Sequence, residues 1–457
     1  MARRQTRSGR GRQPVKEQHP HVQVKASRFS MPSLEDIVQS GAVWLSVIIV
    51  LHLALSMVYI NRVPFGQFPD ERPHAEYTSA LALTGSLPVL STSSRGNYEY
   101  HQPPLYYYLG IPFFLAGRAM GAAEPLQGIR YLSVILGMLS IIVTYAVVKR
   151  AFGEEHLRQR APRRSILAAA FVAFLPTHVM LSSSVSNDIL AELVFGTALL
   201  LIVELLTDRF TLLNTTATGI ILAIGCLTKA TCVILIPVAI VAYLLMYKKC
   251  QCSIKTLAGH VLLMLFVTAA GAGWWFLRNN ALYGDPLAMG IFQSYFGDTA
   301  KPEYWFSQGF TAFQYLELVA TWTFASFWGV FGHMNIFMPS WIYITAAAVS
   351  LIGIAGSIKG IPEWRRQSML SNEIWVVFAT TFVLVLLAFI RFNTVFFQAQ
   401  GRYLYPAIVP IAVLWVLGIE GILPRGERVM SATVIIGFPI VVQAVALSTC
   451  ILAIPNI

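Results

Sequence analysis

The sequence has few charged residues and few cysteines for its length. Only 12% of its 457 residues are charged, whereas a soluble globular protein carries about a quarter. The apolar share is 56% and the mean hydropathy is +0.62, so most side chains must face lipid or other apolar helices. These values exclude an ordinary soluble globule and predict an all-α integral membrane protein.

The five cysteines make neither a disulfide framework nor a complete metal site. They all lie in or beside apolar runs, at Cys226, Cys232, Cys250, Cys252 and Cys450. Cys250 and Cys252 have the spacing of half a metal site, but no second pair of cysteines or histidines accompanies them. We therefore interpret these thiols as inert groups at the membrane surface.

The formal net charge of +11 does not indicate a nucleic-acid partner. The basic residues gather in the N-terminal tail and in short loops between apolar runs, which is the positive-inside pattern of membrane proteins. Residues 1–28 are rich in Arg, Lys, Gln and Pro, and we predict a disordered cytoplasmic tail over residues 1–40. The tail does not have the pattern of a signal peptide, because no small-residue cleavage site follows the first apolar run.

Twelve apolar runs follow the tail in a single membrane domain, residues 41–457. A transmembrane helix needs about 20 apolar residues. The runs fall near residues 42–60, 104–118, 130–149, 165–183, 188–206, 212–228, 231–247, 256–276, 341–358, 373–391, 402–421 and 431–453.

Basic loops set the predicted orientation of these runs. If the run 104–118 does not cross the membrane, every basic loop lies on the cytoplasmic side with the tail. That run is short, starts with two prolines and is rich in tyrosine, which is typical of an interfacial helix. We therefore predict about eleven transmembrane helices, with twelve or thirteen as alternatives, and long outer loops at 61–129 and 277–340. The aromatic stretch 319–338 is interpreted as a surface or re-entrant helix. The loops concerned are 149–164, 248–255, 359–366 and 425–428.

The first outer loop carries the strongest functional signal. It contains FPDERPHAEY at residues 68–77 and closes on HQPPLYYYL at residues 101–109. Acidic residues crowded where an apolar helix leaves a bilayer are costly unless they have a function. Asp70 and Glu71 are therefore the first candidates for a site.

This pattern resembles the C-type glycosyltransferases (GT-C), multispan enzymes that take a sugar from a polyprenyl-phosphate donor on the outer face of the membrane. It is similar to the protein O-mannosyltransferases, the aminoarabinose transferases of lipid A and a related bacterial group. In that superfamily an acidic residue just after the first span carries the chemistry, which here matches Asp70-Glu71. HQPPLYYYL resembles the element that closes the same loop. Further similar stretches are PTHVMLSSSVSND at 176–188, RNNALYGDP at 278–286 and QGRYLYP at 400–406.

The resemblance implies a GT-C-like helical bundle and transfer of a sugar to an acceptor hydroxyl. This chemistry needs a base for the acceptor and a group that holds the departing phosphate. We predict Asp70 as the base, with Glu71 as its substitute or its support. A single displacement inverts the anomeric centre, and we expect inversion, whereas retention would need a second nucleophile.

Three cations on predicted outer loops are expected to meet the donor phosphate, namely Lys229, Arg278 and Arg402. Arg402 ranks first because it begins an apolar run beside Tyr403, which we also predict to bind substrate. In the simpler interpretation Arg402 is an interfacial anchor and Lys229 only ends a hairpin. The isoprenoid tail would lie in an aromatic groove near residues 104–108 and 319–331.

The first outer loop supplies the remaining candidate substrate-binding residues, which are His74, Glu76, His101, Gln102 and Tyr106. For the two histidines, the simpler interpretation is a ring bonded to a loop carbonyl group.

Asp188 is a candidate metal ligand, although its place before an apolar run is equally typical of a helix N-cap. Asp70 and Asp188 could share a Mg or Mn ion only if their two outer loops meet. No cofactor is certain from the sequence.

Two other functions stay open. A lipid or glycan transporter or flippase would carry charged residues within its spans, where this chain has only Glu192 and Glu204. A non-catalytic partner subunit with the GT-C fold would not need Asp70-Glu71. From the resemblance we expect a multi-pass protein of a bacterial plasma membrane, with an outward-facing site and a lipid-linked, glycan or protein acceptor.

Overall fold

The computed structural model describes residues 1–2, 41–91, 97–153, 161–208, 210–297, 299, 301–423 and 428–454. The chain forms two units, Met1–Ser40 and Gly41–Ile457. The tail predicted for residues 1–40 lies almost entirely outside the described residues, as do parts of the basic loops at 149–164 and 425–428. The second unit is the membrane domain.

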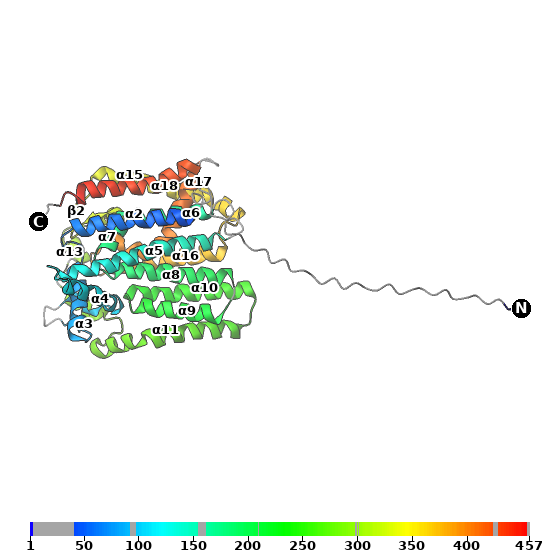
Figure 1. Cartoon of the computed structure of the whole chain (residues 1–457), viewed down its shortest axis with the longest axis horizontal. Coiled ribbons are helices and arrows are strands. Elements are labelled where there is room, and N and C mark those ends of the chain that lie inside the picture. The colour runs from blue at the N-terminus through cyan, green and yellow to red at the C-terminus, as the bar shows by residue number, and fades with distance from the viewer. Residues whose placement is uncertain are drawn as a thin grey trace. The chain divides into compact units, whose positions relative to one another are not determined.

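The membrane domain is a bundle of long apolar helices that lie roughly side by side (Figure 1). Nine helices within the described ranges are long and apolar enough to cross a membrane, so the chain is an integral, multi-pass membrane protein. They are α2 (Gly41–Arg62), α5 (Arg130–Ala151) after the short turn η2 (Pro125–Ile129), α8 (Asp188–Thr207), α10 (Leu235–Cys250) after η3 (Ala230–Ile234), α11 (Ile254–Tyr283), α15 (Ser340–Arg366), α16 (Asn372–Asn393), α17 (Ile408–Ile422) after η4 (Gly401–Ala407), and α18 (Arg428–Ala446) with the π-helical turn η5 (Leu447–Ile451).

Two of the predicted spans are irregular. The run 165–183 forms α6 (Ala161–Phe174) and α7 (Pro176–Ser183), which are bent by 65°. Pro176 explains the bend, because proline lacks the N–H that would continue the helix and disfavours helical geometry at the residue before it. The run 212–228 forms α9 (Leu212–Cys226), which is apolar but only 15 residues long.

The predicted all-α membrane bundle is therefore confirmed, whereas the count of eleven spans is not. Among the described residues nine helices qualify as spans by length and composition, or ten if the bent pair crosses as one. The remaining predicted span, 212–228, corresponds to the short helix α9.

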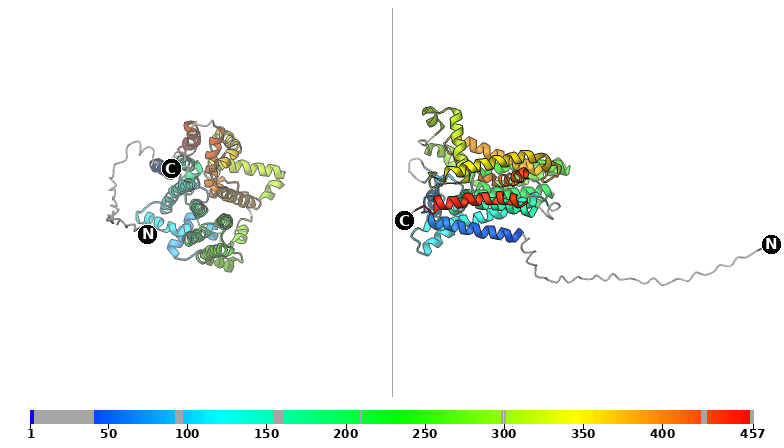
Figure 2. Two further views of the ribbon diagram at one scale, coloured as in Figure 1. Left: turned by 90° about the vertical axis from the view of Figure 1, so that its right-hand side faces the viewer. Right: turned by 90° about the horizontal axis from the view of Figure 1, so that it is seen from above.

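Short elements gather at one end of the bundle, at the left of Figure 1, which we call the site end. The helix α4, which covers the predicted interfacial run 104–118, is only 15 residues long. In Figure 2 the yellow-green helix before the yellow α15 runs across the long helices. The short elements are α3 (Glu71–Thr84), η1 (Tyr98–His101), α4 (Leu105–Ala119), α12 (Met289–Tyr295), α13 (Pro302–Ser307), α14 (Ala312–Trp328) and the antiparallel pair β1 (Val330–Phe331) and β2 (Ile336–Phe337).

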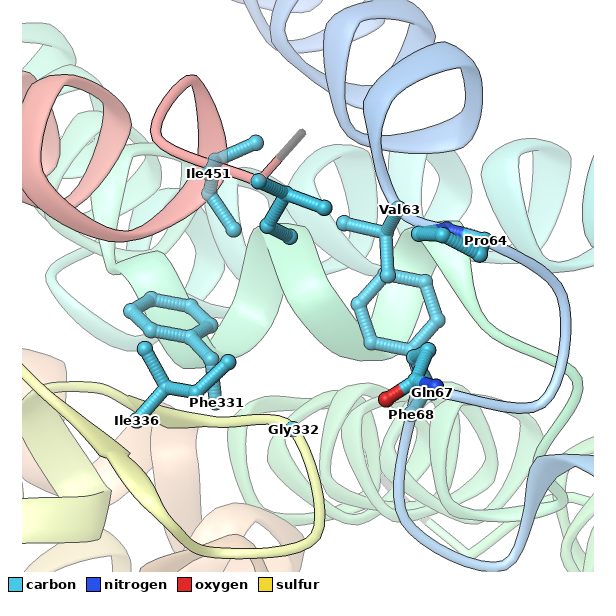
Figure 3. Close-up of a pocket in the computed structure, with 9 residues that line it drawn as sticks. Val63, Pro64, Gln67, Phe68, Phe331, Gly332, Ile336 and Ile451 are labelled. Atoms are coloured by element: carbon cyan, nitrogen blue, oxygen red, sulfur yellow. The ribbon is translucent and has the colours of Figure 1, made fainter. Parts of the chain in front are cut away.

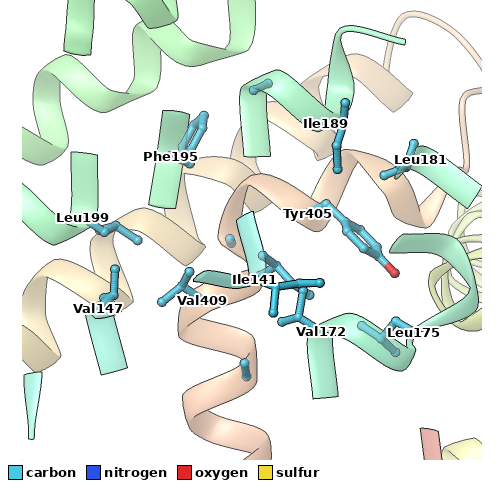
Figure 4. Packing of buried hydrophobic residues seen from close by; sticks show 14 of the residues in the cluster. Ile141, Val147, Val172, Leu175, Leu181, Ile189, Phe195, Leu199, Tyr405 and Val409 are labelled. Carbon is cyan, nitrogen blue, oxygen red and sulfur yellow. The ribbon is translucent and has the colours of Figure 1, made fainter. Parts of the chain in front are cut away.

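The core of the domain lies between α5, α6, α8 and α17. Figure 4 shows Ile141, Val172, Phe195 and Val409 among the buried apolar side chains that these four helices contribute, and all four are at most 3% exposed. Inside a bilayer such packing contributes through van der Waals contact rather than through transfer from water. The two most enclosed spans are α8 and η4–α17, with 72% and 67% of their apolar stretches buried. Side chains at the first turns of these two spans are therefore held on the most rigid part of the domain.

Candidate active site

Four residues from distant parts of the sequence meet at the site end, and we call them the polar cluster. Asp70 precedes α3, Asp188 starts α8, Lys229 precedes η3 and Arg402 lies in η4. Arg402 donates through Nη2 to Asp70 Oδ2, and its Nη1 lies 3.5 Å from Asp188 Oδ2. Lys229 Nζ donates to Asp188 Oδ1. All four were predicted as site residues, and their separation in the sequence shows that the fold assembles the cluster.

Asp188 is held by its position at the start of α8. The N-cap of α8 is Asn187 rather than Asp188, so the carboxylate of Asp188 is free to face the cluster. Ser186 Oγ donates to Asp188 Oδ2 at 3.3 Å, and the positive end of the helix dipole favours a negative charge at this place. Asp188 is therefore not the N-cap of α8, and Asn187 holds that position without a side-chain capping bond.

Asp70 has a backbone conformation that few non-glycine residues adopt. Its φ of +58° lies in the left-handed region, where aspartate and asparagine are better tolerated than most residues. Its side chain does not cap α3 but turns to the cluster, where the Tyr98 hydroxyl donates to Oδ1 at 2.7 Å. Such strained positions concentrate at functional sites.

The ionisation of Asp70 is governed by two opposing effects. Burial raises the pKa of the Asp70 carboxyl, but the ion pair with Arg402 outweighs it and holds this pKa below its ordinary range. Asp70 is therefore ionised at neutral pH, and it is a weak base as long as Arg402 remains its partner.

Glu71 points away from the cluster into a closed set of hydrogen bonds. Arg130 donates through Nε to Glu71 Oε1 at 2.6 Å and through Nη2 to Oε2 at 2.8 Å, and both side chains are fully buried. The backbone N–H groups of Gly66 and Val185 donate to the same carboxylate at 2.8 and 3.3 Å. Of the two roles that the sequence left open for Glu71, this geometry favours support. Arg130 also donates to the carbonyl groups of Ile60, Val63 and Pro64.

Three predicted substrate-binding residues line the loop beside the cluster. His74 Nδ1 lies 2.8 Å from the Tyr107 hydroxyl, and burial lowers the pKa of His74 to about 3. His101 Nδ1 lies 2.6 Å from the carbonyl oxygen of Tyr98, as in the simpler interpretation of this histidine, and burial lowers its pKa to about 4. Gln102 Oε1 accepts a hydrogen bond from Asn187 Nδ2 at 3.3 Å, which ties this loop to the start of α8.

Three other predicted residues lie apart from the cluster. The Tyr106 hydroxyl lies 2.8 Å from Ser133 Oγ. Arg278 donates to the carbonyl oxygen of Pro88 at 2.8 Å. Glu76 is half-buried on α3. Within the described ranges, none of the three has a hydrogen bond or ion pair to the polar cluster.

The two cations of the cluster share one aromatic face. The ring of Tyr403 lies 5.3 Å from the Arg402 guanidinium carbon and 5.6 Å from Lys229 Nζ, within the range of cation–π contacts. The side chain of Arg402 is 5% exposed, and its Nε has no hydrogen-bond partner among the residues that the structure describes. A buried donor without a partner costs about 1–3 kcal/mol, so an anionic ligand oxygen would complete this guanidinium.

Comparison with solved structures identifies the architecture. ArnT from Cupriavidus metallidurans bound to undecaprenyl phosphate matches with a TM-score of 0.53 and 14% identity, over 91% of this chain and 68% of that one. The archaeal oligosaccharyltransferase AglB from Archaeoglobus fulgidus, in complex with an inhibitory peptide and a dolichol-phosphate, matches with a TM-score of 0.50 and 13% identity, over 90% and 56%. Both are GT-C glycosyltransferases. The chain has the GT-C fold.

Sequence comparison adds one family. Residues 101–275 match the family model of dolichyl-phosphate-mannose-protein mannosyltransferases, and no curated protein shows significant sequence similarity to the chain. The GT-C resemblance predicted from the sequence is therefore confirmed. The chain spans about two thirds of the ArnT chain and about half of the AglB chain.

The polar cluster does not fit a divalent metal ion in its present arrangement. The outer loops of Asp70 and Asp188 do meet, but both carboxylates face Arg402, and Lys229 adds a second positive charge. Magnesium and calcium need several oxygen ligands that no competing cation occupies. In the described part of the chain, no group of three His, Cys, Asp or Glu residues could hold a metal.

Two residues of η1 were missed by the sequence analysis. Besides Tyr98, the neighbouring Glu99 is 6% exposed, lies 3.7 Å from His74 Nδ1 and has one carboxyl oxygen without a hydrogen-bond partner. Burial and the charge of Asp70 raise the pKa of Glu99 to about 8, so this carboxyl is mostly neutral at pH 7. The only signal in the sequence was their position just before HQPP.

A second buried polar group lies among the spans. Among the hydrogen bonds and ion pairs of the described residues, Glu192 pairs with His178 at 3.1 Å and accepts from Ser140 Oγ at 2.6 Å, and none joins it to the cluster. His178 and Glu192 are completely buried, and the pair joins α7 to α8.

An apolar cavity of about 200 Å³ opens beside the segment that leads to Asp70 (Figure 3). Of the residues predicted to form the isoprenoid groove, Phe331 lines this cavity, whereas residues 104–108 do not line it. The lining of this cavity is mostly apolar, and Gln67 contributes a polar side chain. The lining residues are Val63, Pro64, Gln67, Phe68, Phe331, Gly332, Ile336, Ile451 and Ile454.

Proposed function

We propose that this protein is a glycosyltransferase that moves a sugar from a polyprenyl-phosphate donor to an acceptor hydroxyl, with the polar cluster as its active site. The observation that carries this proposal is Arg402, a buried guanidinium with one unmatched N–H that lies between two carboxylates. The fold supports it, since the similar ArnT and AglB structures contain undecaprenyl phosphate and dolichol-phosphate.

Arg402 and Lys229 hold the donor phosphate in this proposal. Arginine presents several N–H groups in a planar fork that matches phosphate oxygens, and lysine adds a compact positive charge. The same two cations stabilise the negative charge that develops on the phosphate oxygen as it leaves. Arg278 instead donates a hydrogen bond to the carbonyl oxygen of Pro88, and the proposal does not need it for this role.

Asp70 is the general base. Its carboxylate takes the proton of the acceptor hydroxyl while that oxygen forms a bond to the anomeric carbon. The bond between the anomeric carbon and the phosphate oxygen breaks, and the polyprenyl phosphate leaves with the electron pair. One displacement inverts the anomeric centre, and the step uses no metal.

The basic ends of three spans support the orientation that we propose. Lys149 and Arg150 end α5, Lys248 and Lys249 end α10, and Arg365 and Arg366 end α15. Because α5 and α10 begin at the site end, their basic ends lie at the opposite end of the bundle, which the positive-inside rule places in the cytoplasm. The site then faces outward, as expected for a bacterial plasma membrane, and accepts a lipid-linked, glycan or protein hydroxyl.

One observation favours a lipid transporter instead. The His178–Glu192 pair is buried within the spans, and ionisable residues in such places often mark transport pathways. The transporter function would be supported if the protein moved undecaprenyl phosphate across vesicle membranes without transferring sugar, and if Glu192→Gln abolished this movement.

Sugar transfer from a panel of radiolabelled polyprenyl-phosphate sugars into total membrane fractions tests the proposal. The purified full chain is compared with Asp70→Asn and with Glu303→Gln, an exposed control on α13. We expect transfer by the wild type and the control, and a loss of about 10²–10⁴-fold in Asp70→Asn, because a general base contributes this much. Equal transfer by Asp70→Asn would remove Asp70 from the mechanism, and no transfer by any folded form would favour the transporter or partner-subunit alternatives.

A further inference from the structure

The charges of the polar cluster are balanced before any donor binds. Asp70 and Asp188 carry two negative charges, and Lys229 and Arg402 carry two positive ones, in direct contact. A phosphate that entered this balanced cluster would meet no net positive charge. One carboxylate must therefore leave its cation when the donor phosphate arrives.

Asp188 is the carboxylate that is held more firmly. Its side chain is 9% exposed, it starts the most enclosed span, and it bonds to both Lys229 and Ser186. Lys229 follows the end of α9 directly and has Asp188 as its ion-pair partner. Movement of Asp188 would leave Lys229 unpaired and disturb the start of α8.

Asp70 is the carboxylate that is free to move. Its side chain is 33% exposed, and it lies in a loop with a backbone φ of +58° rather than in a span. Only one of its oxygens is held by a cation, whereas the other accepts the hydroxyl of Tyr98. If Arg402 turned to another anion, Asp70 would keep this neutral partner.

We propose that the donor phosphate displaces the Asp70 carboxylate from Arg402, so that donor binding itself releases the base. Tyr98 keeps the released carboxylate in position as a positioning residue. This inference rests on the proposed glycosyltransferase function and adds an order to it: the donor binds first, and Asp70 can take the acceptor proton only afterwards.

The exchange has a chemical consequence for the base. The ion pair with Arg402 is what overcomes the effect of burial on the pKa of Asp70. Without this pair the pKa rises, and a carboxylate with a higher pKa is a stronger base. The resting protein thus keeps its base weak.

Binding of undecaprenyl phosphate to the full chain in lipid nanodiscs tests the exchange. The forms compared are wild type, Asp70→Asn, Asp188→Asn and Glu303→Gln, each checked for folding by thermal unfolding. Asparagine suits the positive φ of residue 70. We expect Asp70→Asn to bind the lipid about tenfold more tightly than the wild type, because the competing carboxylate is gone, although its sugar transfer falls by about 10²–10⁴-fold.

The controls separate exchange from a simple change of net charge. Glu303→Gln also removes one negative charge at the site end, and we expect its affinity to equal that of the wild type. If Asp70→Asn binds the lipid no more tightly than the wild type, the exchange is overturned. The exchange is also overturned if Glu303→Gln, or a folded Asp188→Asn, gains as much lipid affinity as Asp70→Asn. Absence of both binding and transfer in the wild type would instead reject the proposed function.

Discussion

Asp70 and Glu71 are neighbours in the sequence with opposite surroundings. Glu71 lies in a closed set of bonds to Arg130 and two backbone N–H groups. Asp70 is one third exposed and shares Arg402 with Asp188, and a donor of that arginine has no partner. Both carboxylates are ion-paired to arginine, so pairing alone does not separate support from chemistry. The two differ in the hydrogen bonding of their arginine partners, because Arg402 beside Asp70 keeps one N–H without a partner among the described residues.

The contrast extends to the elements that each ion pair joins. The Glu71–Arg130 pair connects the end of α2, the start of α3 and the start of α5, and it fixes the loop that carries Asp70. The Asp70–Arg402 pair connects that loop to the enclosed span η4–α17. The Glu71–Arg130 pair thus fixes the positions of α2, α3 and α5 relative to one another. The Asp70–Arg402 pair can separate without disturbing these helices.

The largest expected effect on stability is at the closed pair. Glu71→Gln leaves the buried Arg130 without its counter-charge, and breaking such a pair costs about 3–5 kcal/mol. Thermal unfolding of the purified chain should therefore shift strongly, whereas Asp70→Asn should shift little. The comparison fails if Glu71→Gln unfolds like the wild type but has lost sugar transfer, since Glu71 would then act in the chemistry.

A smaller effect is expected where Tyr98 meets the base. Tyr98→Phe removes one hydrogen bond to an ionised carboxylate, a contact worth about 1.5–3 kcal/mol. The activation free energy of transfer at saturating donor should rise by this amount, so the transfer rate should fall. The affinity for undecaprenyl phosphate should stay the same, because Tyr98 bonds to Asp70 and not to Arg402. A loss of lipid affinity with an unchanged rate would show that Tyr98 does not position the base.

A further expected effect is a pH dependence of stability from Glu99. Its ordinary pKa is 4.5, and in the folded protein burial raises it to about 8. Between these values the unfolded chain releases a proton that the folded chain keeps, so stability falls as pH rises. The unfolding temperature of the wild type minus that of Glu99→Gln should be highest near pH 4.5 and should decline as the pH rises to 8. A difference that does not change with pH would contradict the buried, neutral state of Glu99.

Much of the fold was predictable because it depends on local composition. Every apolar run that was predicted to span forms one or two helices, since about 20 apolar residues in a bilayer must satisfy their backbone groups internally. The count of spans was less predictable. Pro176 was visible within the run 165–183, yet whether a proline bends a span or breaks it depends on the helices that pack against it.

The candidate site was predictable where a charged residue interrupts an apolar pattern. Asp188, Lys229 and Arg402 stand at the ends of apolar runs, Asp70 lies in the loop after the first run, and the fold brings the four together. Arg130 stands at such a place too, and only its contacts reveal that it holds Glu71.

The remaining residues depend on long-range packing that the sequence does not display. Tyr98 and Glu99 belong to a polar loop whose composition is ordinary, and their burial depends on helices far away in the chain. Arg278 has the same charge as Arg402 and also lies at the end of a span, but its partner is a loop carbonyl group. Which cation meets a carboxylate is decided by the tertiary structure alone.

An experimental structure of the full chain with undecaprenyl phosphate in a nanodisc is the most direct test of the account. We predict a phosphate oxygen within hydrogen-bond distance of Arg402 Nε and Lys229 Nζ, with Asp70 separated from Arg402 and still bonded to Tyr98. A phosphate bound at Arg278 or elsewhere, with the Asp70–Arg402 pair intact, would contradict the assignment of the polar cluster as the active site.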